Sequence, residues 1–149
     1  MRAVVQRVSH AKVEVDGVLI SSIDFGFLVL VAVIEGDKLE DAEYLAAKLL
    51  GLRVFPDQNQ KMNLNISQAE GSMLVVSQFT LAGDARKGNR PDFTASAKPE
   101  DAILLIDKLV EKISKADIPV YNGLFGAHMA VSLCNDGPVT ILLDTRRAF

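Results

Sequence analysis

The apolar run FGFLVLVAVI, residues 25–34, decides the fold class of this chain. No polar side chain interrupts it on either face, as expected for a central strand that other elements cover on both sides. The run is too short to span a bilayer, and it lies behind a charged, alternating segment instead of at the start. The sequence therefore predicts a buried central strand, and neither a membrane helix nor a signal peptide.

Strand and helix patterns flank this run. Residues 2–23 alternate apolar and polar side chains around Asp16-Gly17, which is a strong hairpin signal. Residues 37–51 carry apolar side chains at helical spacing, and Asp37 with Glu40 has the spacing of a capping box. The remaining pattern predicts a second helix from Pro99, a loop over 83–93, and strands over 52–55, 72–82, 128–134 and 139–144.

Strands and two well-patterned helices follow one another without a linker, a repeat or a low-complexity tract. We therefore expect a single domain over residues 1–149, of α/β class with mixed α+β character, in which helices cover one face of a sheet. Hydrophobic residues make up 49% of the sequence. This high share favours the burial of some apolar surface against a second subunit.

Charge and cysteine content narrow the function classes. The net charge of −3 excludes a general nucleic-acid coating protein, which needs a basic face, and leaves room only for a local basic patch. The single cysteine, Cys134, cannot form an internal disulfide and fits a reducing compartment. We expect a cytoplasmic protein that does not associate with membranes.

Common catalytic motifs are missing from the sequence. It contains neither of the glycine-rich phosphate-binding patterns, and two histidines with one cysteine do not make a zinc site of usual spacing. We expect no metal and no cofactor. His10 and His128 are interpreted as surface or hydrogen-bonded histidines, and Cys134 as a small buried hydrophobic residue.

Two stretches leave alternatives open. SQFTL, residues 77–81, is either an alternating strand end with Phe79 inward or a ligand site where a strand meets a loop. NDGPVT, residues 135–140, is either a turn between two strands or a device in which glycine allows close approach of the main chain. The basic residues of the loop, Arg86, Lys87 and Arg90, are by default solvated.

Together, SQFTL and N-x-G-P-x-T resemble the paired signature of the D-aminoacyl-tRNA deacylase family. The segments MRAVVQRV, LGLRVFPDQNQKMN, KGNRPDF and GLFGAHMAVSLCNDGPVT resemble the family at matching positions, so the resemblance covers essentially the whole chain. Residues around His128 and within DARKGNR differ from those more common in the family. The resemblance implies three layers of antiparallel and mixed sheets with two main helices packed on one side.

The resemblance also implies an activity and an assembly. The protein would be a hydrolase that cleaves the ester between a D-amino acid, or misattached glycine, and the 3′-terminal adenosine of tRNA. Its partners would be D-aminoacyl-tRNA and glycyl-tRNA, and it would act as a homodimer with active sites at the subunit interface. The 2′-hydroxyl of the terminal ribose, instead of an enzyme nucleophile, is implicated in the reaction.

Site residues are implied in the same way. Ser77, Gln78, Phe79 and Thr80 would line the catalytic pocket, where the Phe79 and Thr80 amides are candidates for contacts to the carbonyl oxygen. A cis Gly137-Pro138 bond would project from one subunit into the pocket of the other and reject L-residues. Secondary positions are Ala102, Phe125 and Met129 in the pocket wall, Arg7 as support for the Gly-Pro segment, and Lys87 and Arg90 as contacts to tRNA.

Several of these assignments have alternatives. Phe125 and Met129 fit a core equally well, Arg7 fits an ordinary surface strand, and the C-terminal TRRAF is expected to be a solvated tail. A nucleophilic Thr80 is the second choice of mechanism. Rival functions are a small-ester hydrolase with a Ser77 or Thr80 nucleophile and a noncatalytic RNA-binding module.

Overall fold

The structure is a computed structural model, and it describes residues 1–148. Within these residues the chain forms eight strands, two α-helices and one short 3-10 helix. In chain order they are β1 (Arg2–Val15), β2 (Val18–Ile23), β3 (Gly26–Ala32), α1 (Leu39–Gly51), β4 (Phe55–Pro56), β5 (Met62–Leu64), β6 (Ser72–Ser77), η1 (Phe79–Ala82, the 3-10 helix), α2 (Pro99–Ser114), β7 (Val120–Asn122) and β8 (Ala130–Asp144).

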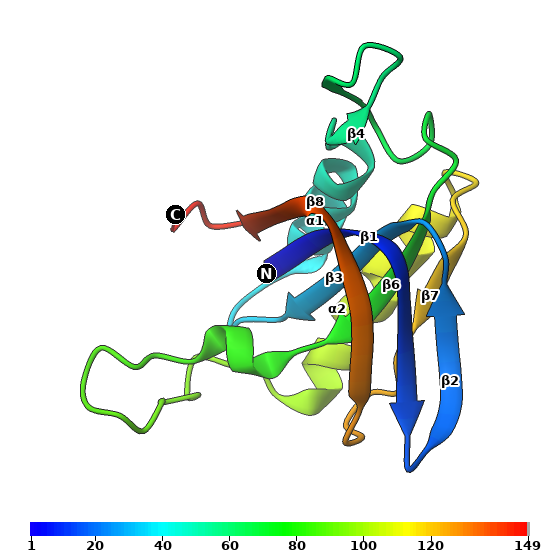
Figure 1. Ribbon diagram of the computed structural model, residues 1–149. Helices are drawn as coiled ribbons and strands as arrows, with labels where there is room; N and C mark the ends of the chain where they lie inside the picture. Colours follow the sequence, from blue (N-terminus) through cyan, green and yellow to red (C-terminus); the bar gives the residue numbers. More distant parts are fainter. Residues whose placement is uncertain (149) are drawn as a thin grey trace.

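Six of the strands form one mixed sheet (Figure 1). Its order is β2-β1-β3-β6-β7, and β8 pairs with the other edge of β1. The pairs that involve β1 are antiparallel, whereas β3–β6 and β6–β7 are parallel. β1 is long enough to pair with β3 over residues 2–8 and with β2 over residues 11–15. β4 and β5 form a separate two-stranded sheet.

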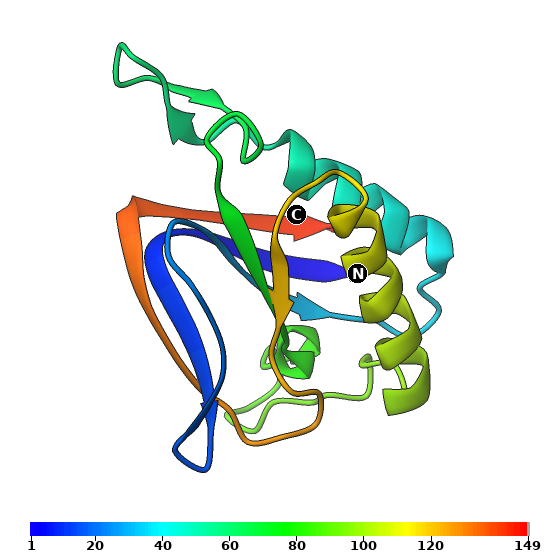
Figure 2. The ribbon, with the colours of Figure 1, turned by 90° about the vertical axis from the view of Figure 1, so that its right-hand side faces the viewer.

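Two hydrophobic cores separate three layers. α1 and α2 cover one face of the sheet (Figure 2), and there Phe27, Val29 and Leu45 are fully buried or nearly so. A second core, with Leu28 and Leu74, lies on the other face of β3 and β6, where β1 and β8 bend and the sheet folds back over itself. Full burial of each such side chain contributes about 1.5–3 kcal/mol. The two-sided burial of β3 and the three-layer α/β fold are confirmed.

β3 and β6 start so close together that only glycine fits at position 26. A methyl group on Gly26 would lie 1.8 Å from the backbone oxygen of Ser72, and the φ angle of Gly26 is +149°, which L side chains rarely adopt. The parallel pairing runs from Gly26 with Ser72 to Val31 with Ser77. The close contact between Gly26 and Ser72 therefore fixes the register of the two strands, and this register places Ser77 at the end of the pair.

The amino group of Met1 is buried. Its ammonium nitrogen lies 2.7 Å from Asp37 Oδ2, with both side chains fully buried, and it donates a hydrogen bond of 2.6 Å to Thr145 Oγ1. Arg146 Nη2 lies 2.8 Å from the other oxygen of Asp37. Thr145 and Arg146 thus hold the C-terminal segment over the start of the chain, so the expectation of a solvated tail was wrong for these residues. Phe149 of that segment lies outside the described residues.

Four local expectations were also wrong. α1 begins at Leu39 with Lys38 as its N-cap, because the Asp37 carboxylate binds Met1 and Asp41 instead accepts the Lys38 N–H at 2.9 Å. The strand expected over 72–82 ends at Ser77, and the strands expected on either side of NDGPVT form the single strand β8. Cys134 is exposed on β8 instead of buried.

Within residues 1–148, no helix combines the length and the apolar character that crossing a membrane requires.

Candidate active site

The SQFTL stretch lies where the parallel pair of β3 and β6 ends. Gln78 N donates a hydrogen bond of 2.7 Å to Val31 O, which is the last link between the two segments. The chain then turns into η1, which starts at Phe79. Because the first N–H groups of a helix have no acceptor within it, the Phe79 and Thr80 amides are not used by η1 itself.

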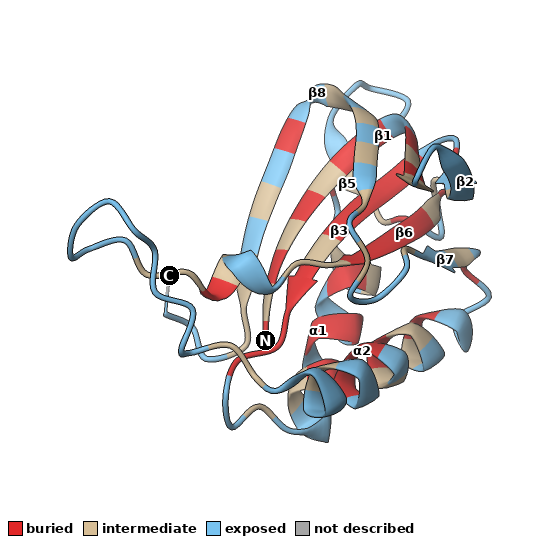
Figure 3. Ribbon diagram, turned by 90° about the horizontal axis from the view of Figure 1, so that it is seen from below, coloured by how far each residue is buried: buried red, intermediate tan, exposed pale blue. Residues whose placement is uncertain are grey.

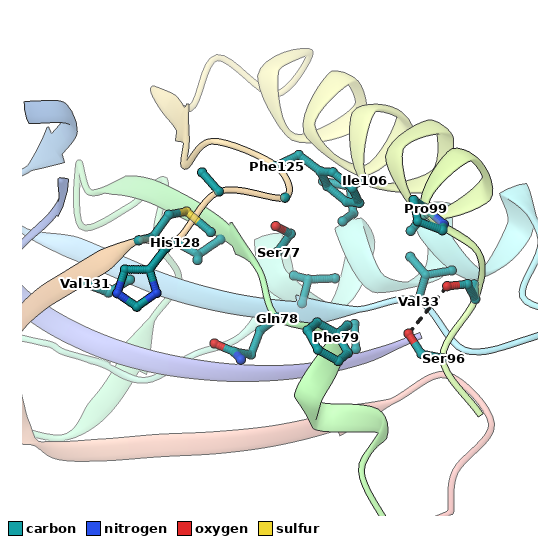
Figure 4. A pocket seen from close by; sticks show the side chains of 18 residues that line it. Val33, Ser77, Gln78, Phe79, Ser96, Pro99, Ile106, Phe125, His128 and Val131 are labelled. Atoms are coloured by element: carbon teal, nitrogen blue, oxygen red, sulfur yellow. Dashed lines mark hydrogen bonds between the residues drawn. The ribbon is translucent and has the colours of Figure 1, made fainter. Parts of the chain in front are cut away.

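A cavity of about 510 Å³ opens beside this strand end. Its volume lies in the range of small-molecule sites. Figure 4 shows the 18 residues that line it, which come from β3, β6 with η1, the start of α2 and the segment before β8. Most of these side chains are apolar. The polar ones are Ser77, Gln78, Ser96 and His128.

Six of the residues named from the sequence line this cavity. They are Ser77, Gln78, Phe79, Ala102, Phe125 and Met129. Thr80 does not line it, because its side chain is exposed on η1 and accepts a hydrogen bond from Gln78 Nε2. The structure also keeps the other predicted positions away from the lining, namely Arg7, Lys87, Arg90, Gly137 and Pro138.

Sequence reasoning missed part of the wall. Ser96 lies in the segment that leads into α2, Ile106 lies on α2, and His128 was interpreted as a surface or hydrogen-bonded histidine. The segment with Ser96 is tied to β3 by the hydrogen bond of 3.0 Å from Ala97 N to Val33 O. Nothing in the residue types marks these positions, because Ser96 and His128 follow the end of β6 by 19 and 51 residues and reach it only through the folded chain.

Phe79 points outward and contacts a second aromatic ring. Its side chain is 58% exposed, so the interpretation that placed it inward was wrong. Its ring lies 5.3 Å from that of Phe93, measured between centroids, in an edge-to-face arrangement. Such aromatic pairs contribute about 0.5–1.5 kcal/mol beyond their buried area. Phe93 therefore connects η1 to the far end of the loop over 83–93.

The charged residues of the loop over 83–93 do not line the cavity. Arg86 binds Asp84 within the loop, and this hydrogen bond lowers the pKa of the Asp84 carboxyl group to about 2. Lys87 and Arg90 are exposed in the same loop. Across residues 1–148 no group of three His, Cys, Asp or Glu side chains is placed to hold a metal ion.

NDGPVT forms a wide bulge in β8 instead of a turn. Arg7 of β1 faces the four residues 136–139, because its two neighbours pair with Asn135 and Thr140. An insertion of this kind bends the strand locally. The Gly137–Pro138 peptide bond is cis, the φ angle of Gly137 is +124°, and both residues are exposed.

Arg7 lies directly beneath this bulge. It is buried, its Nε donates a hydrogen bond of 3.2 Å to Asp136 O, and the same atom lies 3.0 Å from Asp136 Oδ2. Its Nη1 donates to Val54 O at 2.5 Å. A methyl group on Gly137 would lie 2.9 Å from Arg7 Nη2. The alternative of an ordinary surface arginine is therefore wrong.

The bulge lies far from the cavity of its own chain. Val131 is the last residue of β8 that lines the cavity, and Gly137 follows six positions later. At a rise of about 3.3 Å per residue, the two positions are roughly 20 Å apart along the strand. Figure 2 shows the bulge as the bend in β8, at the opposite end from the segment that enters the cavity. Gly137 and the cavity of one chain therefore do not form a common site.

Comparisons with known proteins agree on one family. The family model described as D-Tyr-tRNA(Tyr) deacylase matches residues 4–144. The D-aminoacyl-tRNA deacylase of Thermosipho melanesiensis is 53% identical over 150 residues, and that of Clostridioides difficile is 52% identical over 149 residues, with 100% of each chain covered in both cases.

Solved structures show the same fold. The structure titled "c-Myc DNA Unwinding Element Binding Protein" superposes with a TM-score of 0.91 and 39% identity, and covers 97% of this chain and 98% of its own. A probable eukaryotic D-amino acid tRNA deacylase gives a TM-score of 0.80 at 17% identity, over 95% and 97% of the two chains, and supports the fold alone. Since the family model matches nearly the whole sequence and full-length relatives share half of their residues with it, this chain belongs to the D-Tyr-tRNA(Tyr) deacylase family.

Proposed function

We propose that this chain hydrolyses the ester bond between a D-amino acid and the 3′-terminal adenosine of tRNA. The observation that carries the proposal is the cavity at the end of β6, whose wall contains Ser77, Gln78 and Phe79, in a chain of the deacylase family. The bond to be broken is an activated ester. The enzyme therefore has mainly to orient the substrate and to stabilise negative charge as it develops.

Backbone amides at the start of η1 supply that stabilisation in our proposal. The N–H groups of Phe79 and Thr80 would donate to the carbonyl oxygen of the ester, and the 2′-hydroxyl of the terminal ribose would take part in the attack. Loss of a single donor of this kind typically lowers kcat by about 100- to 1,000-fold. Such a mechanism needs no enzyme nucleophile, consistent with a wall that is mostly apolar.

A nucleophilic Thr80 is a weaker alternative. Its hydroxyl accepts a hydrogen bond from the Gln78 side-chain amide. An amide N–H donor cannot remove the hydroxyl proton, and activation of a hydroxyl normally requires an adjacent base. We expect Thr80→Ala to retain turnover close to that of the wild type, and a loss of several orders of magnitude would favour the nucleophile instead.

A homodimer completes the site in this proposal. Over residues 1–148, β8 pairs only with β1, so its second edge keeps unpaired backbone groups that can bind another chain. Figure 3 shows that β8 is largely exposed or half-buried while β3 and β6 are buried, and Leu142 on β8 is 58% exposed. A second copy would cover this strand and bring its Gly137 to the cavity that its own chain cannot reach.

Gly137 would then act as a filter against L-residues. Its lack of a side chain lets the main chain approach the substrate α-carbon and leaves room there for hydrogen alone. Overpacking in a site that yields costs only about 1–3 kcal/mol, which is about a tenfold to hundredfold discrimination. Stronger rejection requires a wall that does not move, and the hydrogen bonds from Arg7 to the main chain of Asp136 and Val54 support such a wall.

The proposed filter excludes L-amino acids and does not recognise a D-side chain. Broad tolerance of D-amino acids follows, and glycine, which has no side chain to exclude, would also be released from tRNA. The exposed Lys87 and Arg90 would bind tRNA phosphates, since Arg86 is already paired with Asp84.

One assay tests the activity. The protein is incubated with D-tyrosyl-tRNA and L-tyrosyl-tRNA, and free tyrosine is followed over time against a control without enzyme. We expect rapid release from the D-substrate alone. A module that only binds nucleic acid would release neither, and a general esterase would also cleave simple esters that lack ribose.

Subunit mixing tests the shared site. Ala102→Phe is designed to fill the cavity, and Gly137→Ala adds a methyl group at the proposed filter, so each homodimer should lose most of its activity. After denaturation and refolding together, random pairing should restore about a quarter of the wild-type sites, because each mixed dimer has one site free of both changes. No recovery would mean that each chain forms its site alone.

A further inference from the structure

We propose that His128 is a positioning residue that contacts the phosphate linking the terminal adenosine to the rest of the tRNA. Among the described residues that line the cavity, it is the only one with an ionisable side chain. Histidine is the residue whose charge ordinarily changes between pH 5 and 8. The cavity therefore contains one side chain of this class, the imidazole of His128. This inference rests on the proposed deacylase function and concerns how the same site holds its substrate.

The position of His128 selects the part of the substrate that it meets. The residue is exposed and precedes β8 by two positions, so it lies at the rim of the cavity. Figure 4 shows its ring at one end of the lining beside Val131, with Pro99 at the other end. The buried part of the wall is apolar, with Val33 and Val76 almost fully inaccessible. A phosphate is costly to bury without a partner, so it stays at the rim, where the imidazole lies.

Among the described residues that line the cavity, His128 is the one whose protonation would change the charge at this rim, and the exposed Lys98, Glu100 and Asp101 flank the lining on the α2 side. β3, β6 with η1, and α2 contribute no ionisable side chain to the described lining. On β1, Glu14 pairs opposite Ala130, but its carboxylate lies 2.8 Å from Lys12 Nζ and is already partnered. A protonated imidazole would therefore add a net positive charge where the anionic backbone of the tRNA approaches.

The direction of the pH effect on KM shows whether His128 contacts the phosphate or the α-ammonium group of the substrate. Protonated His128 attracts a phosphate, so acid should lower KM for the tRNA substrate. It repels the α-ammonium group of the amino acid, so contact with that group should raise KM in acid. A role in packing alone would change KM equally at all pH values.

The experiment compares the two histidines of the chain. KM and kcat for D-tyrosyl-tRNA are measured near pH 6 and near pH 8 for the wild type, His128→Gln and His10→Gln, a range that spans the usual titration of histidine. His10 is exposed on β1 and does not line the cavity, so it is the matched control. Dividing each variant by the wild type at the same pH cancels the titration of the substrate amino group, and a blank without enzyme removes spontaneous hydrolysis.

We expect the ratio of KM between His128→Gln and the wild type to be about threefold larger at pH 6 than at pH 8, the size of one exposed ion pair. The kcat ratio and the His10→Gln values should not depend on pH. His128→Lys, which keeps a positive charge at both pH values, should retain a low KM and lose the pH dependence. With D-tyrosyl-adenosine, which lacks the phosphate, the difference between His128→Gln and the wild type should disappear.

Two results would overturn the assignment. One is a His128→Gln ratio that is equal at the two pH values, and the other is a pH-dependent difference that persists with D-tyrosyl-adenosine. Both presuppose that the wild type releases tyrosine from D-tyrosyl-tRNA. If it releases none at either pH, the proposed deacylase function fails and this inference fails with it, so the two failures are distinguishable.

Discussion

The interior of the sheet and its outer strand β8 differ in how far the chain completes them by itself. In the interior, Phe27 and Leu45 are fully buried beneath the helices, and Leu28 and Leu74 are buried on the other face. Along β8 and at the mouth of the cavity, Leu142 and Phe79 each remain 58% exposed. The comparison teaches that this chain stabilises the interior with its own side chains. The exposed region is left for molecules that bind to it, which we propose to be tRNA and a second subunit.

The largest expected effect lies in the buried interior, where β3 pairs with β6. Gly26→Ala would place a methyl group 1.8 Å from the backbone oxygen of Ser72, which cannot move without separating β3 from β6. We expect the free energy of unfolding in urea to fall by about 3 kcal/mol or more, at the upper end of overpacking effects. Gly17→Ala is the control, because its added methyl group meets nothing within 4 Å. Equal stability of the two variants would contradict this account of β3.

The next change lies in the exposed region, at the bulge of β8. Gly137→Ala should lower kcat/KM for D-tyrosyl-tRNA by tenfold or more, because the methyl group would occupy the space proposed for the substrate α-carbon. Its effect on unfolding should be smaller than that of Gly26→Ala, since the residue is exposed and the added methyl group would meet side-chain atoms of Arg7 and Val139 at 2.9 Å instead of a backbone oxygen at 1.8 Å. Full deacylation by a folded variant would remove the filter from the proposal.

A smaller effect sharpens the role of the loop over 83–93. Lys87→Gln and Arg90→Gln should each weaken tRNA binding and reduce the slope of log affinity against log salt by about 1, as expected for the loss of one phosphate contact. Arg86→Gln is the matched control, because its guanidinium is held by Asp84. A salt slope that falls as much for Arg86→Gln as for the other two would mean that the loop contacts tRNA through a different residue.

The smallest expected effect concerns ion pairs on the exposed surface of α2. Lys115 and Lys108 lower the pKa of Glu111 to about 2, mainly through the hydrogen bond from Lys115. A lowered pKa stabilises the folded state above the unfolded pKa, near 4.5, and this contribution is lost as the pH falls towards 2. Glu111→Gln should therefore lower the melting temperature slightly at pH 7, less in high salt, and not at all near pH 2.

The fold was largely predictable because it follows from local patterns. The two-sided run at 25–34 and the helical spacing of apolar residues are visible in the sequence and were confirmed as β3, α1 and α2. The error at the start of α1 arose because residues distant in sequence compete for one carboxylate. Asp37 does not cap α1 because Met1 and Arg146 take its carboxylate, and neither partner is near it in sequence.

The site was predictable only in part, for a related reason. The stretch SQFTL alone left a strand end and a ligand site as alternatives, and the family resemblance named the pocket residues. Ser77, Gln78, Phe79, Ala102, Phe125 and Met129 line the cavity, whereas Thr80 does not. Ser96 and His128 were not identified as lining residues, because their residue types are ordinary and only the folded chain brings them to the end of β6. The length of β8 was also missed, because Gly-Pro between two apolar runs is more often a turn than a bulge.

The buried ammonium group of Met1 has a practical consequence for anyone who produces this protein. A formyl group or a fusion peptide on that nitrogen would replace a cation with an uncharged amide beside the fully buried carboxylate of Asp37. A preparation that retains the formyl group should therefore behave like a destabilised mutant whose DNA carries no mutation.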